Sequence, residues 1–155
     1  MTKSLLEIME DVIFLKKYTF FSEVDTEDLK ALAMISQPVA LGAGDLIVKE
    51  GDLGDSFFLI KAGSVKITKG EGEKQITLAV LPAHAGFGEM AIFEDTPRSA
   101  NCYANEDCQL LKISREDLLE VIMEQPRISV ELLRVFGRRL RESNEKVRQL
   151  SESKK

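Results

Sequence analysis

The sequence predicts a mainly β fold with flanking helices, folded as one domain. Its length of 155 residues and its composition, 44% hydrophobic and 30% charged, suit a single soluble domain with its own core. In the middle of the chain, short apolar runs separated by Gly and Asp turns recur about every 8 to 12 residues, which is typical of a barrel, sandwich or jelly roll. The apolar residues before and after this region follow a helical period.

Two helices are expected in residues 1–36, where they would pack on the barrel. The apolar residues of Lys3–Lys17 recur near a 3.6-residue period. A second helix is expected to begin after Asp25 or Thr26, because both residue types are favourable N-caps. The phenylalanine pair between these helices, residues 20–21, is expected to anchor in the core.

Seven strands are expected in residues 37–114. Each apolar run is short, and turn residues stand between nearly every pair of runs. The expected strands are Val39–Leu41, Leu46–Val48, Phe57–Ile60, Val65–Thr68, Ile76–Leu81, Ala100–Tyr103 and Leu110–Ile113.

Two more helices are expected in residues 115–150. Ser114 can cap the first, which should end near Glu124. The second is a long helix over Arg127–Leu150, roughly 35 Å at 1.5 Å per residue. Residues 151–155 are expected to form a frayed tail.

The long helix carries an apolar seam with alternating steps of three and four residues, the spacing of a helix that packs on another surface. Its members are Leu133, Phe136, Leu140, Ser143, Val147 and Leu150. The pattern leaves two alternatives open: packing on its own domain, and a homodimer contact through residues 127–150.

Charge and hydropathy exclude several classes of protein. The chain has 21 basic and 26 acidic residues, a net charge of −5, which argues against direct nucleic-acid binding. A basic excess in residues 138–155 is interrupted by acids and fits a solvated helix face. No apolar run reaches the roughly 18 to 20 residues of a membrane span, and no signal peptide is visible, so a cytoplasmic location is expected.

Few residues are available for catalysis or metal binding. One histidine, His84, and two cysteines, Cys102 and Cys108, cannot supply most metal sites or a disulfide framework. A jelly-roll metalloenzyme needs several histidines, and no Ser-His-Asp set is credible. We therefore expect a binding protein without a metal, and not an enzyme.

The segment Gly86–Ala100 carries the most informative chemistry. Gly88 permits a close backbone approach, so N–H groups at the start of a turn can point at an anion. Arg98 can return to the same place with a permanent charge and a planar fork, and Glu89 can accept a hydrogen bond from a ligand hydroxyl. The set fits a sugar phosphate. An ordinary turn and a structural Glu89–Arg98 ion pair are the alternatives.

The run from Phe87 to Ala100 (FGEMAIFEDTPRSA) resembles the phosphate-binding cassette of cyclic nucleotide-binding domains, the family of the catabolite activator protein and the regulatory subunits of cyclic-AMP-dependent protein kinase. The run Gly44–Gly63, with its turn glycines, is similar to the early barrel of that family, and the resemblance covers about residues 20–150. It implies an eight-stranded jelly roll with N-terminal helices and a long C-terminal helix.

The resemblance also implies roles for individual residues. Glu89 would accept the ribose 2′-hydroxyl, and Arg98 would pair with the cyclic phosphate. Backbone N–H groups of Gly88, Ala91 and Ser99 would join them. The apolar wall would come from Ile60, Val80, Leu81, Phe87 and Met90, for which plain core packing is the alternative.

In the long helix, the resemblance places Ser143 and Asn144 where an adenine amino group is read, with exposure to water as the alternative. Asn144 slightly favours cyclic AMP over cyclic GMP. The expected function is therefore a cyclic nucleotide sensor, whose cassette closes against the C-terminal helix when ligand binds. The sequence shows no output domain after that helix, so we expect either a stand-alone sensor or the end or a fragment of a larger protein, and the output protein or domain is not predicted. The competing hypothesis is a protein interaction module that kept the fold and lost the ligand.

Overall fold

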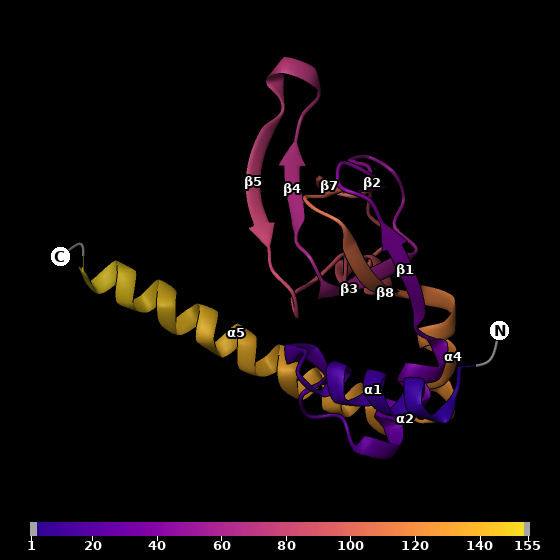
Figure 1. Cartoon of the computed structure of the whole chain (residues 1–155). Helices are drawn as coiled ribbons and strands as arrows, with labels where there is room; N and C mark the ends of the chain where they lie inside the picture. Colours follow the sequence, from indigo (N-terminus) through magenta and orange to yellow (C-terminus); the bar gives the residue numbers. More distant parts are fainter. Residues whose placement is uncertain (1–2, 154–155) are drawn as a thin grey trace.

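The computed structural model describes residues 3–153, apart from the side chains of Met90 and Ala91, and its centre is a β-roll of two sheets (Figure 1). The sheets are antiparallel and four-stranded, with strand orders β1-β8-β3-β6 and β2-β7-β4-β5. The strands are β1 Gln37–Leu41, β2 Leu46–Val48, β3 Ser56–Ala62, β4 Val65–Lys69, β5 Ile76–Leu81, β6 Gly86–Phe87, β7 Asn101–Ala104 and β8 Cys108–Ser114. The predicted eight-stranded jelly roll is confirmed.

The seven strands expected from apolar runs are all present, and the eighth strand is β6. It has only two residues and lies inside the segment Gly86–Ala100, where the apolar runs predicted no strand. It pairs with the middle of β3, Phe87 opposite Phe58 and Gly86 opposite Leu59. A two-residue strand has no period of its own, so the sequence alone could not reveal it.

Strand β3 lies between two hydrophobic cores. Successive side chains of a strand point to opposite faces, so Phe58 and Ile60 lie in the barrel interior, while Phe57 and Leu59 lie against the helices. Its first five residues are all buried, which explains why this strand is apolar at successive positions. The helices therefore share a core with the outer face of the sheet that contains β3.

The helices begin where the capping residues predict. Helix α1, Leu5–Lys16, has a capping box between Ser4 and Glu7, and Asp25 is the N-cap of α2, Thr26–Ile35. The Ser114 hydroxyl accepts the Asp117 N–H at the start of α4. The remaining helical elements are η1 Thr19–Phe21, η2 Gly72–Lys74, α3 Met90–Phe93, α4 Arg115–Glu124 and α5 Arg127–Ser153. Phe20 and Phe21 are buried, as predicted.

Helix α5 has two halves with different surroundings. In the first half Ile128, Leu132 and Val135 are buried against the domain. The second half extends away from the body of the molecule, as the yellow end of the ribbon shows (Figure 1). Of the predicted seam, Leu133, Leu140, Val147 and Leu150 are 56–67% exposed. The domain itself therefore does not cover most of the seam.

Residues 151–153, for which a frayed tail was expected, continue α5, which ends at Ser153. Arg148 bonds Glu145 and Glu152 one turn away on each side, and the Ser153 hydroxyl donates to the Leu150 carbonyl. Such i,i+3 and i,i+4 pairs stabilise a helix end that has no tertiary contact. Residues 154–155 lie outside the described residues.

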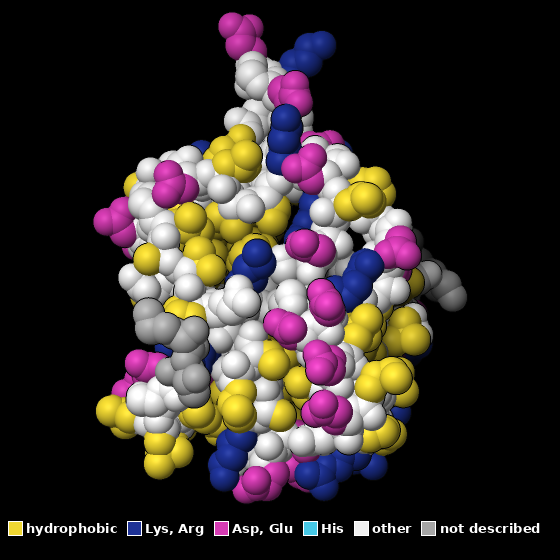
Figure 2. Space-filling model, turned by 90° about the vertical axis from the view of Figure 1, so that its right-hand side faces the viewer, with side chains coloured by type: hydrophobic (Ala, Val, Ile, Leu, Met, Phe, Trp, Pro, Cys, Tyr) yellow, Lys and Arg dark blue, Asp and Glu magenta, His cyan; other side chains and the backbone are white. Residues whose placement is uncertain are grey.

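The surface mixes charge types. On the side that carries α4, acidic side chains gather in a column, with hydrophobic side chains on both flanks (Figure 2). Among the described residues, no helix is both long enough and apolar enough to span a bilayer.

Candidate functional site

Gly88 shapes the turn at the start of the cassette. Its φ is +82°, a backbone conformation that residues with a side chain rarely adopt. A Cβ at this position would collide with Nη1 of Arg98 and would lie 3.4 Å from the Ser56 carbonyl oxygen. The predicted close approach is therefore present, and its first partner is the cassette's own arginine.

The backbone of Arg98 is held by the turn that follows β2. The Arg98 N–H donates to the Asp52 carbonyl at 2.7 Å, and the Gly51 N–H donates to the Arg98 carbonyl at 2.9 Å. A β-bridge between Leu53 and Pro97 continues this contact. The run Gly44–Gly63 thus has a direct structural role, because it fixes the position of the arginine.

The Arg98 side chain points back to the start of β3. Its Nη2 donates to the Ser56 carbonyl at 2.7 Å. A guanidinium has five N–H donors and this bond uses one of them, so the fork can still serve an anion. The side chain is partly buried, and burial lowers its pKa while the nearby Asp55 carboxylate raises it. A partly desolvated cation favours an anionic partner.

The thiol beside Arg98 is neutral. Cys102 lies on β7, and burial raises its pKa to about 11 although the Arg98 charge acts in the opposite direction. Cys102 and Cys108 are both free and buried, so they act as small core residues, as the sequence predicts.

Glu89 lies on the other side of Gly88, at a cavity of about 270 Å³. Its carbonyl accepts the Ile92 N–H at 3.1 Å, which starts the short helix α3. The cavity is lined by Tyr18, Thr19, Phe20, His84, Ala85, Gly86, Glu89, Arg139 and Glu142. Within residues 3–153 no ion pair joins Glu89 to Arg98, and Arg98 is not among the residues that line this cavity.

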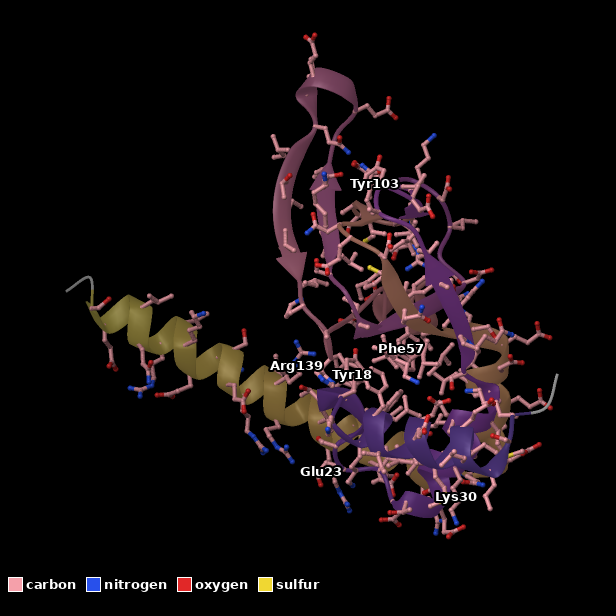
Figure 3. All side chains as sticks on the ribbon, viewed as in Figure 1. Tyr18, Glu23, Lys30, Phe57, Tyr103 and Arg139 are labelled. Atoms are coloured by element: carbon pink, nitrogen blue, oxygen red, sulfur yellow. The ribbon has the colours of Figure 1, made fainter. Side chains whose placement is uncertain are left out.

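Tyr18 and Arg139 complete this cavity and were not found by the sequence analysis (Figure 3). The Tyr18 ring lies so close to Gly86 that a Cβ there would be 2.6 Å from the ring. Burial raises the Tyr18 pKa, and the Glu89 carboxylate raises it further, so the hydroxyl stays protonated. Arg139 lies over the Phe20 ring at 4.5 Å. The helical spacing of Arg139 and Glu142 could have indicated a shared face, whereas no signal marked Tyr18.

The other predicted site residues have varied surroundings. Phe87 stacks on Phe58 inside the barrel, with ring centroids 5.2 Å apart, and Ile60 is fully buried, so core packing describes both. Ser99 is exposed, and its carbonyl accepts a hydrogen bond from Lys69 Nζ. Met90 and Ala91 form the start of α3, and their side chains lie outside the described part of the structure.

Ser143 and Asn144 lie on the exposed outer half of α5. Neither lines the cavity beside Glu89, although the preceding residue, Glu142, does. The single chain therefore brings Gly88, Glu89 and Arg98 together around one turn but does not bring Ser143 or Asn144 into contact with them. Their role in reading a base stays a prediction.

The jelly roll with an arginine held against a glycine turn defines a ligand-binding domain. The family profile described as "Cyclic nucleotide-binding domain" matches residues 38–125, more than half of the chain. A "CRP-like cAMP-activated global transcriptional regulator" from Mycobacterium tuberculosis (strain CDC 1551 / Oshkosh) is 32% identical over 125 residues, which is 80% of this chain and 56% of that protein. The "Cyclic AMP receptor protein" of Thermus thermophilus is 37% identical over 102 residues, covering 65% of this chain and 47% of that protein.

A solved structure agrees with the fold. The N-terminal domain of a transcriptional regulator from Streptomyces coelicolor A3(2) superposes with a TM-score of 0.78 at 30% identity, covering 86% of this chain and 94% of that one. The chain belongs to the cyclic nucleotide-binding domain family and is a sensor module of that family. It spans about half the length of the curated relatives it matches.

Proposed function

We propose that this chain binds a cyclic nucleotide in the cassette of residues 86–100, with cyclic AMP favoured over cyclic GMP. The observation that carries the proposal is the contact of the Arg98 guanidinium with the Gly88 turn, which puts a partly buried cation beside backbone that can approach a phosphate. The names of the regulator from M. tuberculosis and the receptor from T. thermophilus support cyclic AMP as the ligand.

In this proposal the three groups around the turn have separate roles. Arg98 pairs with the exocyclic phosphate oxygens, in place of or in addition to its bond to Ser56. Glu89 accepts the ribose 2′-hydroxyl. Backbone N–H groups of Gly88, Ala91 and Ser99 complete the anion contact. These groups bind and orient the ligand, so the proposed function is recognition and not catalysis.

The proposed signal is closure of the cassette against α5. The two elements already touch, because the Phe93 ring at the end of α3 meets the Phe136 ring of α5 edge-on with centroids 5.9 Å apart. Phe136 also contacts Phe20 of η1 at 4.7 Å, and Arg138 forms an ion pair with Glu23. A ligand that moves Glu89 changes this junction, and it shifts the equilibrium only by its preference for the closed arrangement.

The outer half of α5 supports a proposed homodimer. Leu140, Val147 and Leu150 are more than half exposed on one seam. A second copy of the helix packed along this seam would cover them and would enclose Ser143. The proposal includes an output protein or domain that senses closure of the cassette. It does not include direct nucleic-acid binding, because the net charge of the chain is −5.

The experiment is a calorimetric titration of the nucleotide-stripped chain with cyclic AMP and, separately, cyclic GMP. We expect saturable binding at micromolar concentrations or below, stronger for cyclic AMP. Arg98→Ala should abolish it, and Arg98→Lys should restore part of it because the charge returns without the fork. Arg148→Ala is the matched control, because Arg148 is exposed and its ion pairs lie within its own helix.

Two outcomes would contradict the proposal. Equal affinity in Arg98→Ala and the parent would show that the arginine does not bind the phosphate. No heat and no thermal shift with either nucleotide would favour the interaction module without a ligand.

A further inference from the structure

Three carboxylates meet where α2 begins and α5 begins, and none of them belongs to the cassette. Asp25 is the N-cap of α2, Asp28 lies in its first turn, and Glu131 lies in the first half of α5. Each offers an oxygen, and these oxygens all lie within 4.8 Å of one another. Asp28 is fully buried, Glu131 is 7% exposed, and Asp25 is open to solvent. We call these three residues the α2–α5 carboxylates.

Among the described residues, Arg127 is the cation that forms an ion pair with this cluster. Arg127 donates from Nε and Nη2 to the two oxygens of Asp28, at 2.7 and 2.9 Å. Three carboxylates against one guanidinium leave two negative charges. Each carboxylate oxygen has two lone-pair positions, so the bonds from Arg127 do not prevent Asp28 from accepting a second partner.

Glu131 is the independent observation that points to a missing partner. Its Oε2 is buried and has no hydrogen-bond partner within residues 3–153. Burial raises the pKa of Glu131, and the charges of Asp28 and Asp25 raise it further, against the smaller effects of the Asp25 N–H and Arg127. A buried carboxylate oxygen without a partner is costly, so it requires either a cation or a proton.

Asp25 supplies an entrance to the cluster. An aspartate at an N-cap usually accepts an N–H from its own helix, yet the Asp25 side chain makes no such bond. Its carboxylate is instead one of the three that converge. Because it is exposed, an ion could exchange with solvent past it and could keep water molecules as further ligands.

We propose that the α2–α5 carboxylates bind a divalent cation with a preference for oxygen ligands, Ca²⁺ or Mg²⁺, which ties the start of α2 to the start of α5. Carboxylates from two helices with water completing the shell are the ligands such ions take in proteins. The sequence analysis expected no metal because it weighed histidine and cysteine, and Asp25 and Glu131 lie far apart in the chain. The site is separate from the cassette, so the proposal does not depend on nucleotide binding.

The test is thermal unfolding of the full chain, freed of metal with EDTA and dialysed, in CaCl₂ or MgCl₂, with NaCl of equal ionic strength as reference. At a cation concentration about 100 times the dissociation constant, the melting temperature should rise by about 5 to 10 °C. Glu131→Gln and Asp25→Asn should each lose this rise. Glu120→Gln, which removes an exposed carboxylate of α4, should keep it.

Two results would overturn the site. One is an unchanged melting temperature of the parent at about 10 mM CaCl₂ or MgCl₂. That concentration is above the dissociation constants of weak protein Ca²⁺ sites. In that case a higher melting temperature of Glu131→Gln without metal would show that the unpaired Glu131 carboxyl group destabilises the fold and has no cation to offset it. The other is a shift of equal size in the parent and in Glu131→Gln. Since Asp25 is exposed, Asp25→Asn keeps the test valid even if the Glu131 variant does not fold.

Discussion

The cassette and the outer half of α5 are proposed to touch the same ligand, but their surroundings differ. Arg98 is fixed by hydrogen bonds to Gly51, Asp52 and Ser56, all outside the cassette. Ser143 and Asn144 lie on a helix surface that is exposed to solvent. In the proposed site, the barrel would therefore preorganise the phosphate half. The base half would form only when the cassette closes against α5 or when a second copy of α5 packs on it.

The largest expected difference between the two regions is in binding. Arg98→Ala should weaken cyclic AMP binding by about 2 to 5 kcal/mol, enough to abolish the saturable signal at micromolar concentrations, because the pair between a partly buried cation and the phosphate is lost. Asn144→Ala should change the free energy of cyclic AMP binding by less than about 0.5 kcal/mol, at protein concentrations where sedimentation shows a monomer. Calorimetry on both variants checks this. Comparable losses in the two monomeric variants would mean that one chain brings the outer helix to the ligand.

The two halves of α5 should also differ in their effect on stability. Leu132→Ala removes a buried side chain and should lower the free energy of unfolding by about 2 to 5 kcal/mol. Leu140→Ala, at a 62% exposed position, should lower it by less than about 0.5 kcal/mol. Urea denaturation at low protein concentration measures both. A large effect of Leu140→Ala that grows with protein concentration would instead indicate that the seam is covered in a dimer.

Replacing glycine by alanine should have opposite effects on folding stability in the cassette and in α5. Gly88→Ala forces a side chain into a positive-φ turn against Arg98, so it should destabilise the fold by about 1 to 3 kcal/mol and weaken nucleotide binding. Gly137→Ala has open space around it in the middle of α5 and should stabilise by about 0.5 to 1 kcal/mol. Paired melting curves give the signs directly. Destabilisation by Gly137→Ala would show that another surface approaches the helix there.

The smallest expected effect is on pH dependence. The raised pKa of Glu131 means that the folded state binds this proton more tightly than the unfolded state, so this contribution to stability falls as pH rises from the ordinary glutamate pKa through the raised one. In EDTA, Glu131→Gln should remove that fall. Glu145, in the outer half, has a lowered pKa because Arg148 bonds it, so its small contribution is lost as pH decreases. Melting temperatures of Glu131→Gln, Glu145→Gln and the parent, measured between about pH 4 and 7, test these opposite pH dependences. Parallel curves for all three proteins would contradict them.

Much of the fold could be predicted because its signals are local. The apolar runs and turn glycines marked seven strands, and Ser114 and Asp25 marked helix starts. Strand β6 was missed because Gly86 and Phe87 pair with β3 only through tertiary contact. The end of α5 was predicted too early because its stabilising ion pairs outweigh the expectation that a chain end frays.

The part of the candidate site that lies within one short segment of the chain could also be predicted from the sequence. Gly88, Glu89 and Arg98 stand within one short segment, and the structure places them around one turn. Tyr18 and Arg139 come from opposite ends of the chain, and the Glu89 cavity that they line has no sequence signature. The spacing of the seam residues placed Ser143 on an apolar face of the helix. Such spacing shows which residues share a face, but it does not show what packs against that face.

By itself, the sequence determined the fold class and the family, and it put Gly88, Glu89 and Arg98 of the proposed site in one segment. It could do so because strand alternation, turn residues and a contiguous motif act over short distances along the chain. Only the tertiary structure decided that Gly51, Asp52 and Ser56 hold Arg98 in place, that the outer seam of α5 is uncovered, and that Asp25, Asp28 and Glu131 share one partly buried cluster. These features depend on contacts between distant segments, and such contacts form only when the hydrophobic faces of helices and sheets pack together.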